Sequence, residues 1–178
     1  MKIAILGWGS LIWQPKDLAF NKEFGWKSTG PILPIEFARI SNDGRLTLVI
    51  TEKGTEITTL YASSIYHDLH EAIFNLAVRE GSGKKSIGYY DKNNNAFFST
   101  NLNIKSNIEK WIEQMDFDAV IWTDLPEKLE SKDPLEYLKS LTGNKSALAE
   151  EYIRRTPIQI KTALRTKIEK ELNWKPIE

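Results

Sequence analysis

The chain begins with Ile3-Ala4-Ile5-Leu6, directly followed by Gly7-Trp8-Gly9-Ser10-Leu11, and this stretch constrains the structure most. A short apolar run that ends at a glycine is typical of a buried strand. Two glycines separated by one residue let the backbone approach a ligand closely, and free N–H groups there can hold a carboxylate or an oxyanion. We therefore predict that residues 7–11 form one wall of a small-molecule site. The alternative is a tight turn that needs its glycines only for shape.

Other residues of this loop narrow its chemistry. The spacing departs from the dinucleotide fingerprint Gly-x-Gly-x-x-Gly, because Ile12 occupies the third glycine position and Pro15 interrupts the helix that should follow. Ser10 lacks the following glycine of a nucleophile elbow, so we do not expect its hydroxyl to act as a nucleophile. Trp8 and Trp13 are expected to wall the pocket.

The composition is that of a soluble globular protein. The 178 residues suffice for one domain, and 41% of them are hydrophobic, which is typical of a packed core. The 24 basic residues balance the 24 acidic ones, so we expect no nucleic acid and no membrane partner. The absence of cysteine excludes thiol catalysis and thiolate metal sites and fits the cytosol. We expect one domain over residues 1–178, cytoplasmic, acting as a monomer or homodimer on a small-molecule substrate without a cofactor.

The order of the remaining elements predicts an α+β fold. Apolar patterning predicts six further strands, at residues 35–41, 46–51, 58–64, 86–91, 96–102 and 118–123. Helical spacing and capping residues predict helices at 67–80 and 107–114, and three more with caps at Asp133, Ser146 and Thr156, the last reaching about Asn173. We therefore expect a small mixed β-barrel or sheet of about six or seven strands, with one embedded helix and a helical C-terminal third.

The apolar stripe of the helix at residues 67–80 ends in a carboxylate. Ile73, Leu76 and Glu80 lie at steps of three and four, so they share one face of the helix. Partial burial and the negative end of the helix macrodipole both favour the protonated acid, which suits general acid–base chemistry. The alternative is an exposed glutamate paired with Arg79 or Lys84.

Arg39 is a candidate ligand for an anion. It falls in line with Ile35 and Phe37 on a strand face that is otherwise expected to be buried. A buried arginine needs an anion nearby, so Arg39 is either a snorkelling or ion-paired residue within the protein or a clamp for a ligand carboxylate.

Several other conspicuous residues receive structural interpretations. His67 and His70 are three residues apart, but the chain offers no further histidine or cysteine, so no metal site is expected. The charges of residues 165–171 are expected to form a solvated helix face. Aromatic residues at helix or strand spacing are expected in the core, namely Trp122, Tyr137 and Tyr152.

The loop and the helix end together resemble the γ-glutamylcyclotransferase superfamily. Members of that family carry a strand followed by Tyr-Gly-Ser-Leu or Tyr-Gly-Ser-Asn, which corresponds here to Trp8-Gly9-Ser10-Leu11. Their catalytic glutamate lies just before a glycine at a helix end, as in Arg79-Glu80-Gly81. The resemblance covers about the first 125 residues in outline and implies the family's small mixed barrel. Trp8 departs from the usual tyrosine, and the helical C-terminal third is longer than in the smallest members.

The resemblance implies an intramolecular acyl transfer that needs no cofactor. The α-amine of a γ-glutamyl group attacks its own γ-carbonyl and releases 5-oxoproline and an amine or amino acid. Glu80 would carry the proton, and the backbone N–H groups of residues 9–11 would hold the substrate α-carboxylate or the oxyanion. Together with the interpretation of the residues given above, the expected substrate-binding residues are Gly7, Trp8, Gly9, Ser10, Leu11 and Arg39. Two alternatives stay open. One is a non-catalytic protein that binds a small metabolite on the same fold, and the other is an acid–base enzyme for a different amide or lactam.

Overall fold

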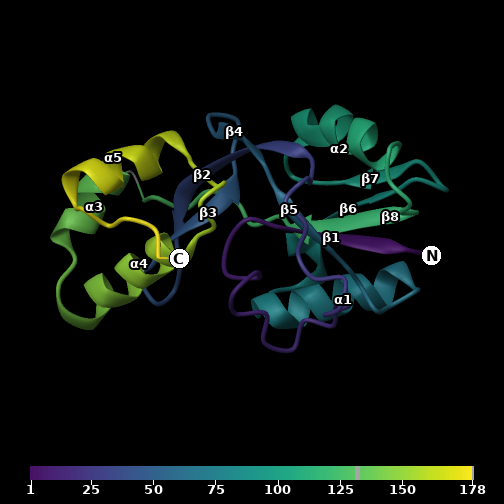
Figure 1. Ribbon diagram of the computed structural model, residues 1–178, viewed down its shortest axis with the longest axis horizontal. Helices are drawn as coiled ribbons and strands as arrows, with labels where there is room; N and C mark the ends of the chain where they lie inside the picture. Colours follow the sequence, from purple (N-terminus) through teal and green to yellow (C-terminus); the bar gives the residue numbers. More distant parts are fainter. Residues whose placement is uncertain (131–132, 178) are drawn as a thin grey trace.

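A computed structural model describes residues 1–130 and 133–177, which form two sheets and five α-helices (Figure 1). The larger sheet has the strand order β5-β1-β8-β6-β7 and the smaller one β3-β2-β4. The strands are β1 (Ile3–Gly7), β2 (Ile32–Ile40), β3 (Leu46–Ile50), β4 (Thr55–Thr58), β5 (Leu60–Ser63), β6 (Ile87–Asp91), β7 (Ala96–Phe98) and β8 (Ala119–Thr123). The helices are α1 (Leu69–Glu80), α2 (Lys105–Ile112), α3 (Pro134–Ser140), α4 (Gly143–Arg155) and α5 (Ala163–Glu171).

Both sheets are open. β1 pairs with β8 in parallel, whereas its other neighbour β5 and the remaining strand pairs are antiparallel. The predicted mixed α+β architecture with a helical C-terminal third is therefore confirmed. Within the described residues the strands close no barrel, and they number eight rather than six or seven.

The strand β1 is covered on both faces, which explains its uninterrupted apolar sequence. Ile3 and Ile5 pack into the cluster that contains the buried face of α1, whereas Ala4 and Leu6 pack into the cluster that contains α2 and the smaller sheet. Successive side chains of a strand point to opposite faces, so a strand buried on both sides has no polar positions. Figure 1 shows α1 and α2 on opposite sides of the larger sheet.

One predicted strand, residues 58–64, belongs to two sheets. β4 ends at Thr58 in the smaller sheet, and β5 begins at Leu60 in the larger one. Thr59 lies between them, fully buried, and both its backbone N–H and its hydroxyl donate to the carbonyl of Pro31. The chain therefore crosses from one sheet to the other at Thr59, which apolar alternation alone did not reveal.

The predicted C-terminal end of α1 and the predicted start of α3 are confirmed, whereas α1 begins at Leu69 rather than at residue 67. Asp68 caps α1 by accepting a hydrogen bond from the N–H of Glu71, and Gly81 ends it in the left-handed conformation at φ 61°. The Asp133 side chain accepts hydrogen bonds from two backbone N–H groups at the start of α3. These termini depend on residues close in sequence, which is why the sequence revealed them.

The predicted starts of the last two helices are wrong. α4 begins at Gly143 rather than Ser146, and the final helix begins after a Thr162 cap rather than at Thr156. Arg165 supplies the physical reason, because its guanidinium binds three carbonyls of residues 156–160 and holds that segment in a non-helical conformation. Arg165 is fully buried, so the prediction that it lies on a solvated face is also wrong.

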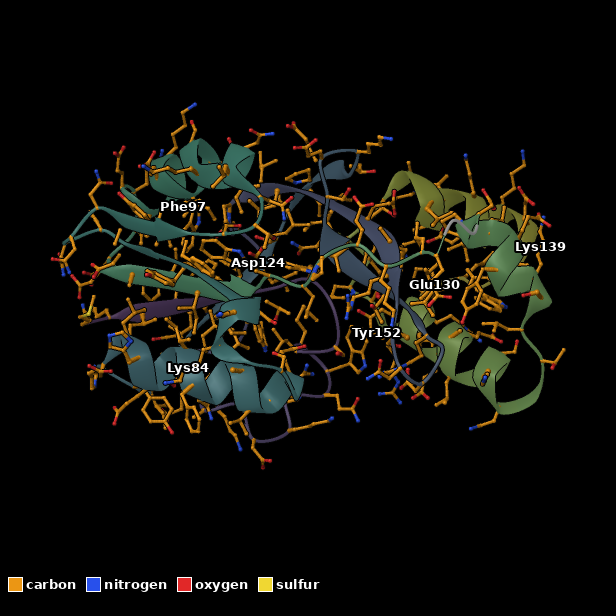
Figure 2. The ribbon with its side chains drawn as sticks, turned by 180° about the vertical axis from the view of Figure 1, so that it is seen from behind. Lys84, Phe97, Asp124, Glu130, Lys139 and Tyr152 are labelled. Atoms are coloured by element: carbon orange, nitrogen blue, oxygen red, sulfur yellow. The ribbon has the colours of Figure 1, made fainter. Side chains whose placement is uncertain are left out.

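The molecule is elongated, with α3, α4 and α5 gathered beside the smaller sheet at one end (Figure 1). The N-terminus and α2 lie towards the other end. Trp122 is fully buried in the core, as predicted. None of the described helices has the length and apolar character needed to cross a bilayer. Tyr152 of α4 lies near the junction of the two ends (Figure 2).

Candidate active site

A cavity of about 270 Å³ lies where four parts of the chain meet. These are the loop after β1, the C-terminal end of α1, the β2–β3 hairpin and α4, and the end of β8 with the residues after it adds Thr123 and Leu125. The volume is close to the lower end of small-molecule sites, which is about 300 Å³. Of the residues predicted to form the site, six line this cavity: Trp8, Gly9, Ser10, Leu11, Arg39 and Glu80.

Two residues of the predicted wall lie elsewhere. Gly7 is not among the residues lining the cavity, and its lack of a side chain is explained by packing. A Cβ at position 7 would lie 2.6 Å from Cζ3 of Trp26. Trp13 also does not line the cavity; its ring packs edge-on against Tyr152, with the centroids 5.4 Å apart. The structure thus narrows the wall to residues 8–11.

The loop presents unpaired backbone donors. Its carbonyls are engaged, since the Gly9 and Ser10 oxygens accept hydrogen bonds from the N–H groups of Ile12 and Gln14. No described residue accepts a hydrogen bond from the N–H groups of Gly9, Ser10 or Leu11. Free N–H groups at the wall of a cavity are suited to binding a carboxylate or an oxyanion.

Arg79 connects Glu80 to this loop. Its Nη1 lies 2.6 Å from Oε1 of Glu80, and its Nη2 donates to the Ser10 hydroxyl at 3.2 Å and to the Gln14 carbonyl at 2.6 Å. The side chains of the ion pair are only 6% and 14% exposed. The suggested pairing with Arg79 is therefore present, but Glu80 is not the solvent-exposed residue of that alternative. The guanidinium therefore holds the Glu80 carboxylate at the cavity wall, beside the loop that follows β1.

A β-bulge determines where Arg39 points. In the β2–β3 ladder Phe37 pairs with Leu48 and Arg39 pairs with Thr47, so β2 carries one extra residue between them. Because side chains alternate along a strand, one extra residue moves Arg39 to the face opposite Phe37. The prediction that Arg39 shares the buried face of Phe37 is wrong. Its position beside the cavity results from the bulge, and its Nη1 donates to the Pro126 carbonyl at 2.8 Å.

The cavity is lined by more cations than anions. Lys16, Arg39, Arg45 and Arg79 line it, and Glu80 is the only acidic residue among the described lining residues. Nε of Arg45 lies 2.8 Å from Oδ2 of Asp43. Burial raises the pKa of Asp43, but the hydrogen bonds from Arg45 and Ser41 outweigh it, so the pKa is lowered overall. In the described part of the chain neither Lys16 nor Arg39 has an acidic partner. The site therefore favours an anionic ligand.

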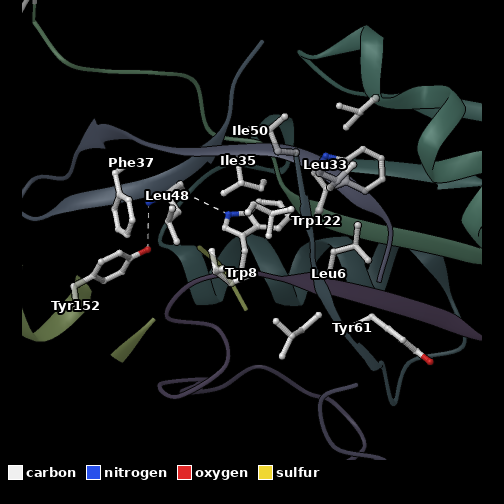
Figure 3. Close-up of a cluster of buried hydrophobic side chains, with 14 of the residues drawn as sticks. Leu6, Trp8, Leu33, Ile35, Phe37, Leu48, Ile50, Tyr61, Trp122 and Tyr152 are labelled. Atoms are coloured by element: carbon white, nitrogen blue, oxygen red, sulfur yellow. Dashed lines mark hydrogen bonds between the residues drawn. The ribbon is translucent and has the colours of Figure 1, made fainter. Parts of the chain in front are cut away.

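Sequence reasoning missed Tyr152 and Arg45 as lining residues. Tyr152 was assigned to the core, and it is indeed buried, but its hydroxyl reaches the cavity from a helix more than 100 residues away along the chain. The Leu48 N–H donates to this hydroxyl at 3.4 Å, and the Trp8 indole N–H donates to the Leu48 carbonyl at 3.4 Å (Figure 3). Two further hydroxyls of lining residues, those of Ser82 and Thr123, are buried and have no hydrogen-bond partner among the described residues.

The two histidines lie at the other end of α1. Nδ1 of His67 is 3.0 Å from the Met1 carbonyl, and His70 is exposed. Within residues 1–130 and 133–177 no three histidine, aspartate or glutamate side chains are grouped so that they could hold a metal ion.

Comparisons of the chain with protein-family models, with curated proteins and with solved structures found no match. The function is therefore inferred from the residues of the cavity and their geometry.

Proposed function

We propose that the protein is a cytoplasmic enzyme of the γ-glutamylcyclotransferase type, with a variant of that family's fold. One observation carries the proposal. The carboxylate of Glu80 and the unpaired backbone N–H groups of residues 9–11 belong to the same cavity. A base that moves a proton and donors that hold an oxyanion are the two groups that this ring closure needs.

In the proposed reaction, the α-nitrogen of a γ-glutamyl amide, in its neutral amine form after the ammonium has lost one proton to solvent, attacks its own γ-carbonyl carbon. Glu80 takes a proton from that nitrogen, and the carbonyl oxygen becomes an oxyanion held by the N–H groups of residues 9–11. The bond from the carbonyl carbon to the leaving nitrogen then breaks, and Glu80 returns the proton to that nitrogen. The products, 5-oxoproline and a free amine, contain every atom of the substrate. Because the attack is intramolecular, correct positioning supplies much of the rate.

Arg79 orients the base in this proposal. Its guanidinium binds Glu80 and also Ser10 and Gln14, so the carboxylate and the loop are held at one distance from each other. A catalytic group that is already held in place loses little conformational freedom when the substrate binds. Ser10 accepts a hydrogen bond from Arg79, which fits a structural rather than a nucleophilic role for its hydroxyl.

The charge of the cavity indicates which γ-glutamyl compounds it favours. A γ-glutamyl group carries one carboxylate and one ammonium, so its own net charge is zero. Lys16 and Arg39, which have no acidic partner among the described residues, favour a substrate with an additional negative charge. We expect that charge on the leaving group.

A non-catalytic binding protein is the second candidate, and the Arg79–Glu80 ion pair favours it. In this second candidate the carboxylate, bound to the guanidinium at 2.6 Å, helps to hold the cavity wall and does not move a proton. Such a protein would bind a γ-glutamyl compound and leave it unchanged.

The test is to incubate the purified protein with γ-glutamyl-L-alanine and to follow 5-oxoproline and alanine by mass spectrometry. The enzyme is expected to release both in equal amounts. Thermal stabilisation by the dipeptide without any product would support the binding protein instead. Turnover of other amides or lactams but not of γ-glutamyl compounds would identify the third alternative.

A further inference from the structure

Tyr152 of α4 lines the cavity and is held in place by its neighbours. Its side chain extends from α4 towards β3, and its hydroxyl lies beside the backbone of Leu48 (Figure 3). Three neighbours hold its ring: Trp13 and Phe37 pack edge-on at centroid distances of 5.4 and 6.4 Å, and the Arg45 guanidinium lies 5.5 Å from the ring centre. With its ring fixed on several sides, the hydroxyl has little freedom to move.

The Tyr152 hydroxyl also lies directly against the loop after β1. A Cβ built on Gly9 would be 2.5 Å from Oη of Tyr152, closer than any side chain could tolerate. Position 9 therefore accommodates the phenol only if it is glycine. Because the N–H of Gly9 is one of the unpaired donors of the cavity, the hydroxyl and these donors lie side by side.

The hydroxyl proton has no acceptor in the described part of the chain. The oxygen accepts from the Leu48 N–H, at the long distance of 3.4 Å, and no described group accepts from the hydroxyl in return. Burial raises the pKa of Tyr152 to about 12, assisted by the negative charge of Glu80 and opposed by the Leu48 hydrogen bond. The phenol therefore stays protonated at neutral pH and can donate.

We propose that Tyr152 is a catalytic residue whose hydroxyl donates a hydrogen bond to the γ-carbonyl oxygen of the substrate as that oxygen becomes the oxyanion. The backbone N–H groups of residues 9–11 are the other donors to the same oxygen. This role rests on the proposed cyclotransferase activity. It also gives the C-terminal helices a function, since α4 completes a site that the first 125 residues leave open on one side.

A purely structural role for the hydroxyl is less consistent with these contacts. A hydrogen bond of 3.4 Å contributes little to holding the hairpin, and the ring is already held by Trp13 and Phe37. A donor fixed before the substrate arrives, with its proton unpaired, is the arrangement that stabilises a developing negative charge.

The experiment compares Tyr152→Phe with the wild-type protein in the release of 5-oxoproline from γ-glutamyl-L-alanine. The variant keeps the ring and loses only the hydroxyl, so the thermal unfolding midpoint should stay within a few degrees of wild type. We expect kcat to fall about 100-fold, as for the loss of one oxyanion donor, with little change in KM. The matched control is Tyr90→Phe, whose hydroxyl donates to Asn95 away from the cavity and whose loss should leave kcat unchanged.

A second variant guards against a structural effect of the lost hydroxyl. Replacement of Tyr152 by 3-fluorotyrosine keeps the donor and should retain kcat within a few-fold of wild type. An active wild-type enzyme with an equally active Tyr152→Phe variant would overturn this role alone. A loss in Tyr152→Phe that appears wholly in KM would also overturn it. A wild-type protein that releases no 5-oxoproline would overturn the proposed function and this role together.

Discussion

The cavity has two walls of different chemistry. The loop–helix wall, residues 8–11 and 79–82, carries the unpaired backbone N–H groups and Glu80. The hairpin wall, residues 39–49 with Tyr152, carries two arginines and a phenol. No described lining residue of the hairpin wall is acidic. In the proposed reaction the loop–helix wall moves the proton and holds the oxyanion together with Tyr152, whereas the arginines of the hairpin wall attract the negative charge of the leaving group.

Two contacts described above join the walls. The indole N–H of Trp8 donates to the carbonyl of Leu48 (Figure 3). The hydroxyl of Tyr152 lies against Gly9. These contacts set the distance between the base and the cationic groups. Substitutions that affect one wall, the contact between walls, or the other wall should therefore have separable effects.

The largest expected effect on stability comes from removing the Arg79–Glu80 ion pair of the loop–helix wall. Arg79→Gln leaves the nearly buried Glu80 carboxylate without its partner, so the free energy of unfolding should fall by about 3 kcal/mol. Urea denaturation measures it. The control Arg155→Gln breaks an exposed ion pair with Glu151 and should cost less than about 1 kcal/mol. Equal losses of unfolding free energy in the two variants would show that the Arg79–Glu80 ion pair does not stabilise the wall.

The contact between the walls can be broken by one methyl group. Gly9→Ala places a Cβ against the Tyr152 hydroxyl, and relieving that overlap should cost about 2 kcal/mol of stability. The double variant with Tyr152→Phe should recover part of the loss, because the two sites are in contact. Gly83→Ala is the matched control, since a Cβ there meets nothing within 4 Å. Additive losses in the double variant would contradict the contact.

The smallest expected effect concerns the hairpin wall and is specific to one substrate. γ-Glutamyl-L-alanine and γ-glutamylethylamide differ only in the carboxylate of the leaving group. Arg39→Gln should raise KM about tenfold for the first, the effect of losing about 1.4 kcal/mol of charge-assisted binding, and leave the second unchanged. Lys110→Gln, an exposed change on α2, should alter neither. Equal rises for both substrates would place Arg39 at the α-carboxylate, and no rise would remove it from binding.

The two walls also differ in how far the sequence predicts them. Residues 8–11 and Glu80 belong to local patterns, a strand end with glycines and a helix stripe that ends in a carboxylate. Such patterns depend on residues close in sequence, so they can be recognised without the tertiary structure. Arg79 was recognised only as a possible partner, because its contacts with Ser10 and Gln14 join segments 65 and 69 residues apart. Gly7 was included because a glycine needed for packing on Trp26 looks the same in sequence as one needed for a ligand.

The hairpin wall depends on features that have no local signal. A bulge of one residue in β2 reversed the direction of Arg39, and alternation without the bulge predicts the wrong face. Tyr152 reaches the cavity because α4 packs on β3, an arrangement set by long-range contacts rather than by helix periodicity. Residues 58–64 are divided between two open sheets, where the sequence predicted one strand of a single barrel or sheet. This division also depends on long-range strand pairing, which local alternation does not reveal.

The most direct test of the proposed activity is the release of 5-oxoproline from γ-glutamyl-L-alanine by wild type, Glu80→Gln and Glu71→Gln. Glu71 lies on the same helix and is exposed, so its change controls for the loss of one charge. We expect Glu80→Gln to lose about 10³-fold in kcat while still being stabilised by the dipeptide, and Glu71→Gln to match wild type. A Glu80→Gln variant that releases 5-oxoproline at the wild-type rate would contradict the proposed role of Glu80.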